Sequence, residues 1–151
     1  MKITIETPAP GQEDEIIIRC GQLDDGLMDL IHALKSGRSK LTAYSDSGIT
    51  MLSTKEVFYF EAVDNKVFAY CEKQVYEVRK KLYELEDDLY GTDFLRISKS
   101  TIVDLSKVVN LSSAFNGRLE AKLKNGEKIM ISRKYVPNLK QKLGIIGGNY
   151  G

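Results

Sequence analysis

The stretch that decides the fold is Phe94-Leu95-Arg96-Ile97-Ser98-Lys99-Ser100-Thr101-Ile102-Val103-Asp104. It begins with alternating apolar residues, passes through a short polar corner and ends in a β-branched run, a pattern typical of two strands joined by a corner. The hydroxyl groups of Ser98 and Ser100 and the ammonium group of Lys99 favour water or an anion. Two interpretations remain open: an ordinary polar turn, or a corner that contacts phosphates and base edges with Arg96 behind it.

The formal net charge of +1 conceals a strong segregation along the chain. Residues 1–95 hold 11 cationic and 18 acidic residues, a net charge of −7, whereas residues 96–151 hold 11 cationic and 3 acidic residues, a net charge of +8. Such asymmetry indicates a polyanionic partner for the basic part. The alternative is a solvated surface whose charges are unevenly distributed.

Length and composition favour one globular domain with a short appendage. The chain has 151 residues, of which 42% are hydrophobic and 28% charged, enough to bury a core. It contains no apolar run near the roughly 18 residues of a membrane span, and no basic flank precedes an apolar segment at its start. The sequence therefore predicts a cytoplasmic protein, in which the two cysteines, Cys20 and Cys71, are reduced.

The first 40 residues predict a small β-β-α extension. Residues 1–6 and Glu15–Cys20 read as strands, and the loop between them contains Pro8, Pro10 and Gly11. Asp24 or Asp25 can cap a following amphipathic helix that ends near Gly37. Because this unit is too small to fold well alone, we expect it to pack on the rest of the chain or on a second subunit.

The middle of the chain is dominated by strand patterns. Val57–Val63 is apolar on both faces, which predicts a central strand. The turn that follows, Asp64-Asn65-Lys66, is rich in residues that tolerate positive φ. A change of period over Glu77–Leu89 predicts an amphipathic helix with a charged outer face.

Two Asn-Gly pairs give the clearest local signal. Asn116-Gly117 and Asn125-Gly126 are flanked by strand-like runs, and Asn-Gly is the preferred pair for tight type I′ hairpins. Residues 108–114, 118–124 and 127–131 are therefore predicted to form a three-stranded antiparallel meander. Beyond it, a loose turn at Ser132 leads to a last helix near Pro137 that ends at Gly144, and residues 145–151 are expected to be a flexible tail.

The sequence gives little support to catalysis. The single histidine, His32, lies in the acidic part without a motif around any serine, and no glycine-rich phosphate loop precedes a helix. Neither cysteine lies in a metal-ligand spacing. We therefore expect no enzyme activity, no metal, no cofactor and no small-molecule substrate.

From about residue 41 to residue 144 the sequence resembles the LytTR domains, the DNA-binding modules of many bacterial transcription regulators. The resemblance is carried by several segments in matching order: Val57–Ala62, Leu85–Leu89, Phe94–Ser100, Ile102-Val103, Asn116–Leu119, Lys124–Glu127 and Ser132–Val136. It implies a mainly β, elongated antiparallel fold with short helices, which is α+β by element count. Such domains read double-stranded DNA in the major groove with loops between strands, commonly as two protomers on direct repeats.

Carried over onto this chain, the resemblance implies three DNA-contacting regions. They comprise Asn65 and Lys66 after the central strand, the corner with Arg96, Ser98, Lys99 and Ser100, and Ser132, Arg133 and Lys134 before the last helix. These residue types suit the task, since Arg reads guanine, Asn reads adenine, and Lys and Ser hold phosphates. Ser98 stands where the family commonly has histidine, and Asp104 where it commonly has asparagine, so we expect Asp104 to face away from DNA.

The resemblance leaves the first 40 residues for dimerisation or a regulatory contact, because they cannot hold a receiver domain of about 120 residues. It also implies a homodimer, together with a membrane or signalling protein as a further partner. A second hypothesis competes with DNA reading: an adaptor of the same fold that binds protein, motivated by the altered corner and the acidic first half.

Overall fold

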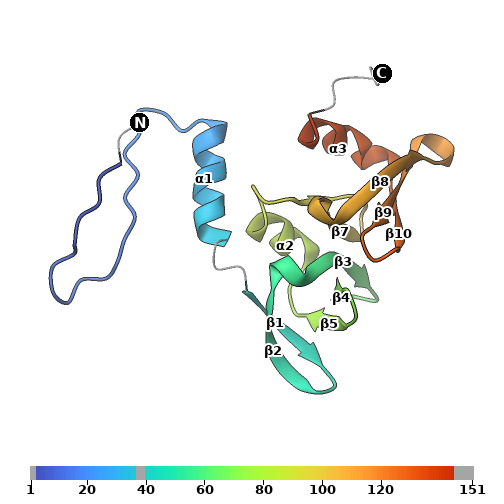
Figure 1. Ribbon diagram of the computed structural model, residues 1–151, viewed down its shortest axis with the longest axis horizontal. Coiled ribbons are helices and arrows are strands. Elements are labelled where there is room, and N and C mark those ends of the chain that lie inside the picture. Colours follow the sequence, from blue (N-terminus) through green and yellow to red (C-terminus); the bar gives the residue numbers. More distant parts are fainter. Residues whose placement is uncertain (1–2, 37–39, 145–151) are drawn as a thin grey trace.

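The computed structural model describes residues 3–36 and 40–144, with the side chains of 32–36 excluded. It is mainly β, with two antiparallel sheets and short helices, which confirms the predicted fold class (Figure 1). The strands are β1 (Lys40–Ser45), β2 (Gly48–Ser53), β3 (Val57–Val63), β4 (Lys66–Cys71), β5 (Val75–Val78), β6 (Phe94–Arg96), β7 (Thr101–Asp104), β8 (Val108–Ser113), β9 (Leu119–Leu123) and β10 (Lys128–Ile131). The helices are α1 (Asp25–Ser36), α2 (Leu82–Asp88) and α3 (Val136–Lys142), and the 3-10 turns are η1 (Thr54–Glu56), η2 (Leu105–Lys107), η3 (Phe115–Gly117) and η4 (Arg133–Tyr135).

The larger sheet has the strand order β2-β1-β5-β4-β3-β7-β6. As predicted, β3 is an interior strand, since it pairs with β4 on one side and with β7 on the other. One face of this sheet packs on α2, where Phe60 and Leu85 are fully buried. This core fixes the position of β3, whose end leads into the first of the predicted contact regions.

The smaller sheet is the predicted meander, with the order β10-β9-β8. It packs with α3 on the other face of β3 and β7, and the second core includes the fully buried Ile97, Val103, Ile131 and Leu139. The last helix begins as expected: the 3-10 turn η4 leads into α3, which carries a proline in its first turn. This second core joins the basic C-terminal part to the central strands.

The two Asn-Gly pairs differ in conformation. Asn116 and Gly117 have φ values of 62° and 75°, as a type I′ turn requires. At the second pair only Gly126 has a positive φ, 89°, so the prediction of a type I′ turn there is wrong. The side chain of Asn125 instead accepts a hydrogen bond from the amide of Glu127, at 3.0 Å, which stabilises the alternative turn.

The two strands predicted within residues 1–40 are absent from the described residues, although the helix is present. Asp24 caps α1 by accepting a hydrogen bond from the amide of Leu27, at 2.7 Å. Residues 3–23 are extended but unpaired, because no strand edge of the same chain lies beside them (Figure 1). The predicted helix stop at Gly37 and the tail 145–151 lie outside the described residues.

The helix predicted over Glu77–Leu89 is shorter than expected. Glu77 and Val78 belong to β5, where they pair with Phe68 and Val67 of β4. Helix α2 then begins after Lys81, whose backbone is extended. The amide N–H of Lys81 donates to the side chain of Glu84. For Glu77 and Val78, pairing with the open edges of β4 and β1 is favoured over the helix that their sequence period predicts.

Candidate nucleic-acid interface

The structure brings the three predicted contact regions together at one end of the sheets. The amide of Ala62, near the end of β3, donates to the carbonyl of Ser100 at 2.8 Å. The amide of Ser132 donates to the carbonyl of Ile97 at 2.9 Å. The corner at residues 97–100 therefore lies in the middle, with the β3–β4 turn on one side and the segment 132–134 on the other.

The corner is a compact turn built on a buried residue. Ile97 is fully buried in the second core, and its amide donates to the carbonyl of Thr101 at 2.9 Å. The hydroxyl of Ser98 accepts a hydrogen bond from the amide of Ser100 at 3.2 Å. Lys99 is exposed at its tip. The serines therefore shape the corner, and the ammonium group of Lys99 is available to an anion.

Arg96 supports the corner from behind. Its Nε donates to the carbonyl of Ser98 at 2.8 Å and its Nη2 to the carbonyl of Lys99. Its Nη1 forms an ion pair of 3.3 Å with Glu86, and only 18% of the side chain is exposed. A planar fork that serves three acceptors at once fixes the loop geometry. The geometry therefore favours positioning, rather than base contact, as the role of Arg96.

The β3–β4 turn presents the first predicted pair. Asp64 and Asn65 have φ values of 51° and 64°, the signature of a tight type I′ connection. Val63 pairs with Lys66 across this turn, and both Asn65 and Lys66 are exposed. The side chains of Asn65 and Lys66 are thus held on a short turn next to the corner.

The third region is the start of η4. Arg133 and Lys134 are exposed, whereas Ser132 is half-buried against the corner. The stem of Arg133 lies against the η3 turn: a Cβ added at Gly117 would come within 3.0 Å of Cδ of Arg133. Because Gly117 also has a positive φ, a side chain there would both strain the turn and displace Arg133.

A groove of about 450 Å³ runs beside the corner and contains two cations that the sequence analysis did not select. Its lining includes Ser98, Ser100 and Ser132 from the predicted set, together with Arg118 and Lys128. Lys128 is exposed in β10 and Arg118 is exposed immediately before β9, and an outward position in the predicted meander could have suggested both. Which face of the meander borders the corner depends on how the two sheets pack, and a linear pattern does not give that.

Glu61, which lines this groove, and Glu127 are hydrogen-bonded to tyrosines. Tyr59 and Tyr70 stack with ring centroids 4.5 Å apart, and the hydroxyl of Tyr70 donates to Glu61 at 3.4 Å. Burial, reinforced by the neighbouring Glu127, raises the pKa of Tyr59 well above its ordinary value, and burial beside Glu61 raises that of Tyr70. Both hydroxyls therefore stay protonated and can donate to these carboxylates, which lessens the repulsion that an approaching polyanion meets.

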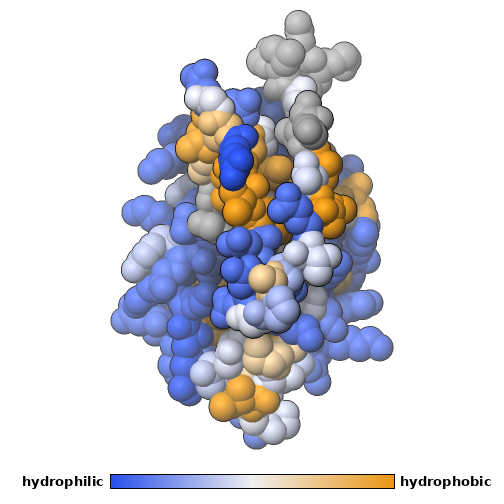
Figure 2. All heavy atoms as spheres, turned by 90° about the vertical axis from the view of Figure 1, so that its left-hand side faces the viewer, coloured by the Kyte–Doolittle hydropathy of each residue, from blue (hydrophilic) through white to orange (hydrophobic). Residues whose placement is uncertain are grey.

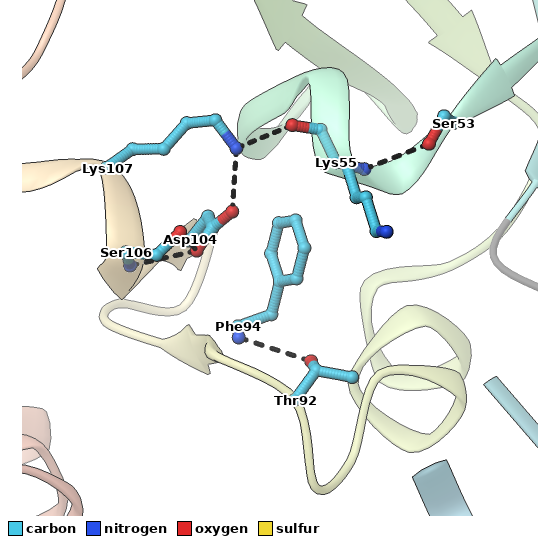
Figure 3. Close-up of polar contacts among 7 residues, drawn as sticks. All are labelled: Ser53, Lys55, Thr92, Phe94, Asp104, Ser106 and Lys107. Atoms are coloured by element: carbon cyan, nitrogen blue, oxygen red, sulfur yellow. Dashed lines mark hydrogen bonds and ion pairs between the residues drawn. The ribbon is translucent and has the colours of Figure 1, made fainter. Parts of the chain in front are cut away.

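Asp104 is taken up by an internal network (Figure 3). Its carboxylate accepts from the amide and the hydroxyl of Ser106, at 2.9 and 2.7 Å, and pairs with Nζ of Lys107 at 2.8 Å. The same ammonium group donates to the carbonyl of Lys55 at 2.7 Å, which ties η2 to η1. Asp104 is 5% exposed, so its carboxylate is turned inward and stabilises the fold through these contacts.

Among the described residues, no three His, Cys, Asp or Glu side chains cluster as a metal site, and no helix is long and apolar enough to cross a membrane. The three α-helices are separated by strands, so the described part of the chain contains no two helices joined by a short turn. The fold presents a set of β-loops that carry cations and hydroxyls. These are the groups with which nucleic-acid-binding domains contact phosphates and bases.

Comparison with known proteins defines the family. The model of the LytTr DNA-binding domain matches residues 47–144, so the chain belongs to this family of DNA-binding domains. A solved LytTr DNA-binding domain from Bacillus cereus superposes with a TM-score of 0.67, at 24% identity, over 70% of this chain and 97% of that one. Two proteins named as uncharacterized HTH-type transcriptional regulators, from Staphylococcus aureus strains NCTC 8325 and COL, are each 29% identical over 147 residues, covering 96% of this chain and 99% of theirs.

Proposed function

We propose that this protein is a bacterial transcriptional regulator that reads a specific duplex sequence in the major groove with the loops at one end of its β-fold. Its family is defined by DNA binding, not by a catalytic activity. Its relatives in Staphylococcus aureus are named as transcriptional regulators. We propose further that it binds two direct repeats as a homodimer in the cytoplasm.

One observation carries the proposal: three cationic segments far apart in the sequence are joined by backbone hydrogen bonds at one end of the molecule. Among the predicted contact residues, the exposed cations there are Lys66, Lys99, Arg133 and Lys134. A rigid loop that projects one or two such side chains can enter a major groove, where Arg pairs bidentately with guanine. The other lysines supply phosphate contacts, which position the protein without reading sequence.

Within this set the structure suggests a division of roles. Lys99, Arg133, Asn65 and Lys66 are exposed and are proposed to contact DNA, whereas Ser98, Ser100 and Ser132 line the groove and give shape to the corner. Arg96 is proposed to position the corner through its bonds to the carbonyls of Ser98 and Lys99. Arg118 and Lys128 join the set as candidates for backbone contacts.

The proposal is tested by selecting bound fragments from a random duplex pool with the full chain. We expect recovery of a pair of direct repeats, and an affinity for them that falls steeply with salt because phosphate contacts release counterions. Failure to enrich any duplex, together with capture of a protein ligand that competing DNA does not displace, would instead favour an adaptor of the same fold.

A further inference from the structure

The N-terminal arm, residues 3–23, lacks a partner for its backbone. Within these described residues there is no strand, and the single backbone–backbone hydrogen bond joins the amide of Gln12 to the carbonyl of Ala9 at 3.0 Å. Two extended runs lead away from α1 and return beside each other, clear of the sheets (Figure 1). Extended chain with free donors and acceptors is able to add to an open sheet edge.

The arm is also strongly apolar for a segment in water. The exposed fractions of Ile3, Ile5, Ile16, Ile17 and Ile18 are 82%, 93%, 72%, 66% and 37%. Figure 2 shows apolar side chains gathered in the upper part of the face where the arm lies. Exposed apolar patches of this kind mark interaction surfaces.

The solvent-accessible surface area of the chain is large for its mass. The chain exposes 11,147 Å², whereas a compact monomer of 17.0 kDa exposes roughly 7,700 Å². The excess, roughly 3,400 Å² per chain, is larger than the roughly 1,000–2,500 Å² that each protomer of an obligate dimer buries, so the chain exposes enough surface for such an interface. An arm of 21 residues also matches the 20 to 30 residues that each side contributes to a standard interface.

The same chain has a vacant surface that suits the arm. β2 is the terminal strand of the larger sheet, and its side chains Ile49 and Met51 are 69% and 58% exposed. Beside Ile49 lies a groove of about 820 Å³, lined by Tyr44, Phe68 and Val75 among others. At this groove the guanidinium of Arg79 stacks on the ring of Tyr44 at 3.9 Å.

Arm and edge are complementary in two respects. The run Glu15–Cys20 is six residues long, as is β2. Its three consecutive isoleucines, Ile16–Ile18, put apolar side chains on both faces of an extended run, so one face would lie on Ile49 and Met51 of β2.

In the structure the arm lies to one side of α1 (Asp25–Ser36), clear of its own β2 edge (Figure 1). Reciprocal exchange between two copies would cover both edges and close the assembly. The Staphylococcus aureus relatives align over 147 residues of this chain, so their similarity extends into the arm.

We propose that the N-terminal arm of one copy pairs with the β2 edge of a second copy, and that this reciprocal exchange forms the dimer. The inference rests on the homodimer of the proposed function and supplies its contact, but it does not depend on which duplex is read. The arm then becomes ordered β-structure only in the assembly.

Sedimentation velocity of the full chain without DNA tests the exchange. We expect a dimer for the wild type. The arm variant Ile16→Asp/Ile18→Asp and the edge variant Ile49→Asp/Met51→Asp should each raise the dimer dissociation constant at least tenfold. Val109→Asp, at a 55% exposed position of the smaller sheet, is the matched control and should remain dimeric. Circular dichroism should show an intact fold in all three.

Mixing the two variants distinguishes the exchange from other dimers. The arm variant keeps an intact edge and the edge variant keeps an intact arm, so their equimolar mixture should recover a dimer with one working contact. A monomeric wild type, a dimeric arm variant, or a dimer that tolerates the edge variant would each overturn the inference. A dimer that nevertheless enriches no duplex would overturn the proposed function and leave the exchange standing.

Discussion

Glu15–Cys20 and Val57–Val63 have nearly the same strand pattern, yet only the second is a strand. Val57–Val63 is β3, paired on both edges and buried on both faces. Glu15–Cys20 is extended, unpaired and exposed. The difference lies outside the two segments, in whether a vacant edge lies next to them.

An apolar, strand-like run therefore specifies a surface that needs covering and leaves open which element covers it. In the body of the molecule, residues 40–144, every strand has a partner in the same chain. In the arm the isoleucines have none. The pattern of the arm is therefore consistent with a strand that forms between chains.

The largest effect should come from breaking the central strand. Phe60 is fully buried in the first core and packs at 5.6 Å from the ring of Phe94, so Phe60→Ala should lower the free energy of unfolding by about 3–5 kcal/mol. Urea unfolding measures the loss. Ile17→Ala in the exposed arm, studied at a concentration where the chain is monomeric, should change stability by less than about 0.5 kcal/mol. Equal losses would erase the distinction between the two segments.

The second prediction separates arm and body by their roles on DNA. Arg133→Ala should weaken binding to the selected duplex by about 1–3 kcal/mol, because an exposed guanidinium that pairs with a base edge is lost. Fluorescence anisotropy with a single repeat measures the change. Lys73→Ala, in the turn beyond the far end of β4, and the arm variant Ile16→Asp/Ile18→Asp serve as controls and should retain wild-type affinity. An unchanged affinity in Arg133→Ala would remove this residue from the interface.

The third prediction concerns strand ends, which are secured in the body and free in the arm. Asp104→Asn keeps one acceptor but loses the ion pair with Lys107, so stability should fall by about 1–2 kcal/mol. Chemical unfolding again gives the value. If Asp104→Asn proves neutral, the network of Figure 3 contributes less than its geometry suggests.

Local signals were sufficient for much of the fold. The type I′ turn at Asn116-Gly117, the central strand and the turn before α3 are encoded within a few residues each, and the structure has them where they were expected. The second half of the helix predicted from Glu77 is also present as α2, whereas Glu77 and Val78 pair with the open edge of β4. Edge availability, like the placement of Arg118 and Lys128 beside the corner, is set by contacts between distant segments.

Arg96 shows the same limit at a single residue. Its charge and its position next to the corner made it a candidate for contact with DNA, whereas its three hydrogen bonds depend on the path of the loop and on the place of α2. Sequence gives the residue type that a site requires. It does not distinguish an arginine that reaches a ligand from one that supports the loop that does.

The smallest effect compares the two cysteines, one in the arm and one in the body. Burial beside Glu56 raises the pKa of Cys71 from 9.0 to about 11, whereas Cys20 is exposed. At pH 8 a shift of this size leaves about a hundredfold less thiolate, and the higher intrinsic nucleophilicity of that thiolate returns about tenfold, so a net slowing of about tenfold is expected. Thiol titration of Cys20→Ser, which isolates Cys71, should show a rate of thiol modification that keeps rising with pH toward 11.

Because the thiol of Cys71 is harder to ionise in the folded chain, its contribution to stability is complete below pH 9 and is lost as the pH rises toward 11. A rate that levels off below pH 9 would show that Cys71 is as open to solvent as the arm, and the contrast between covered and uncovered strands would not extend to the end of β4.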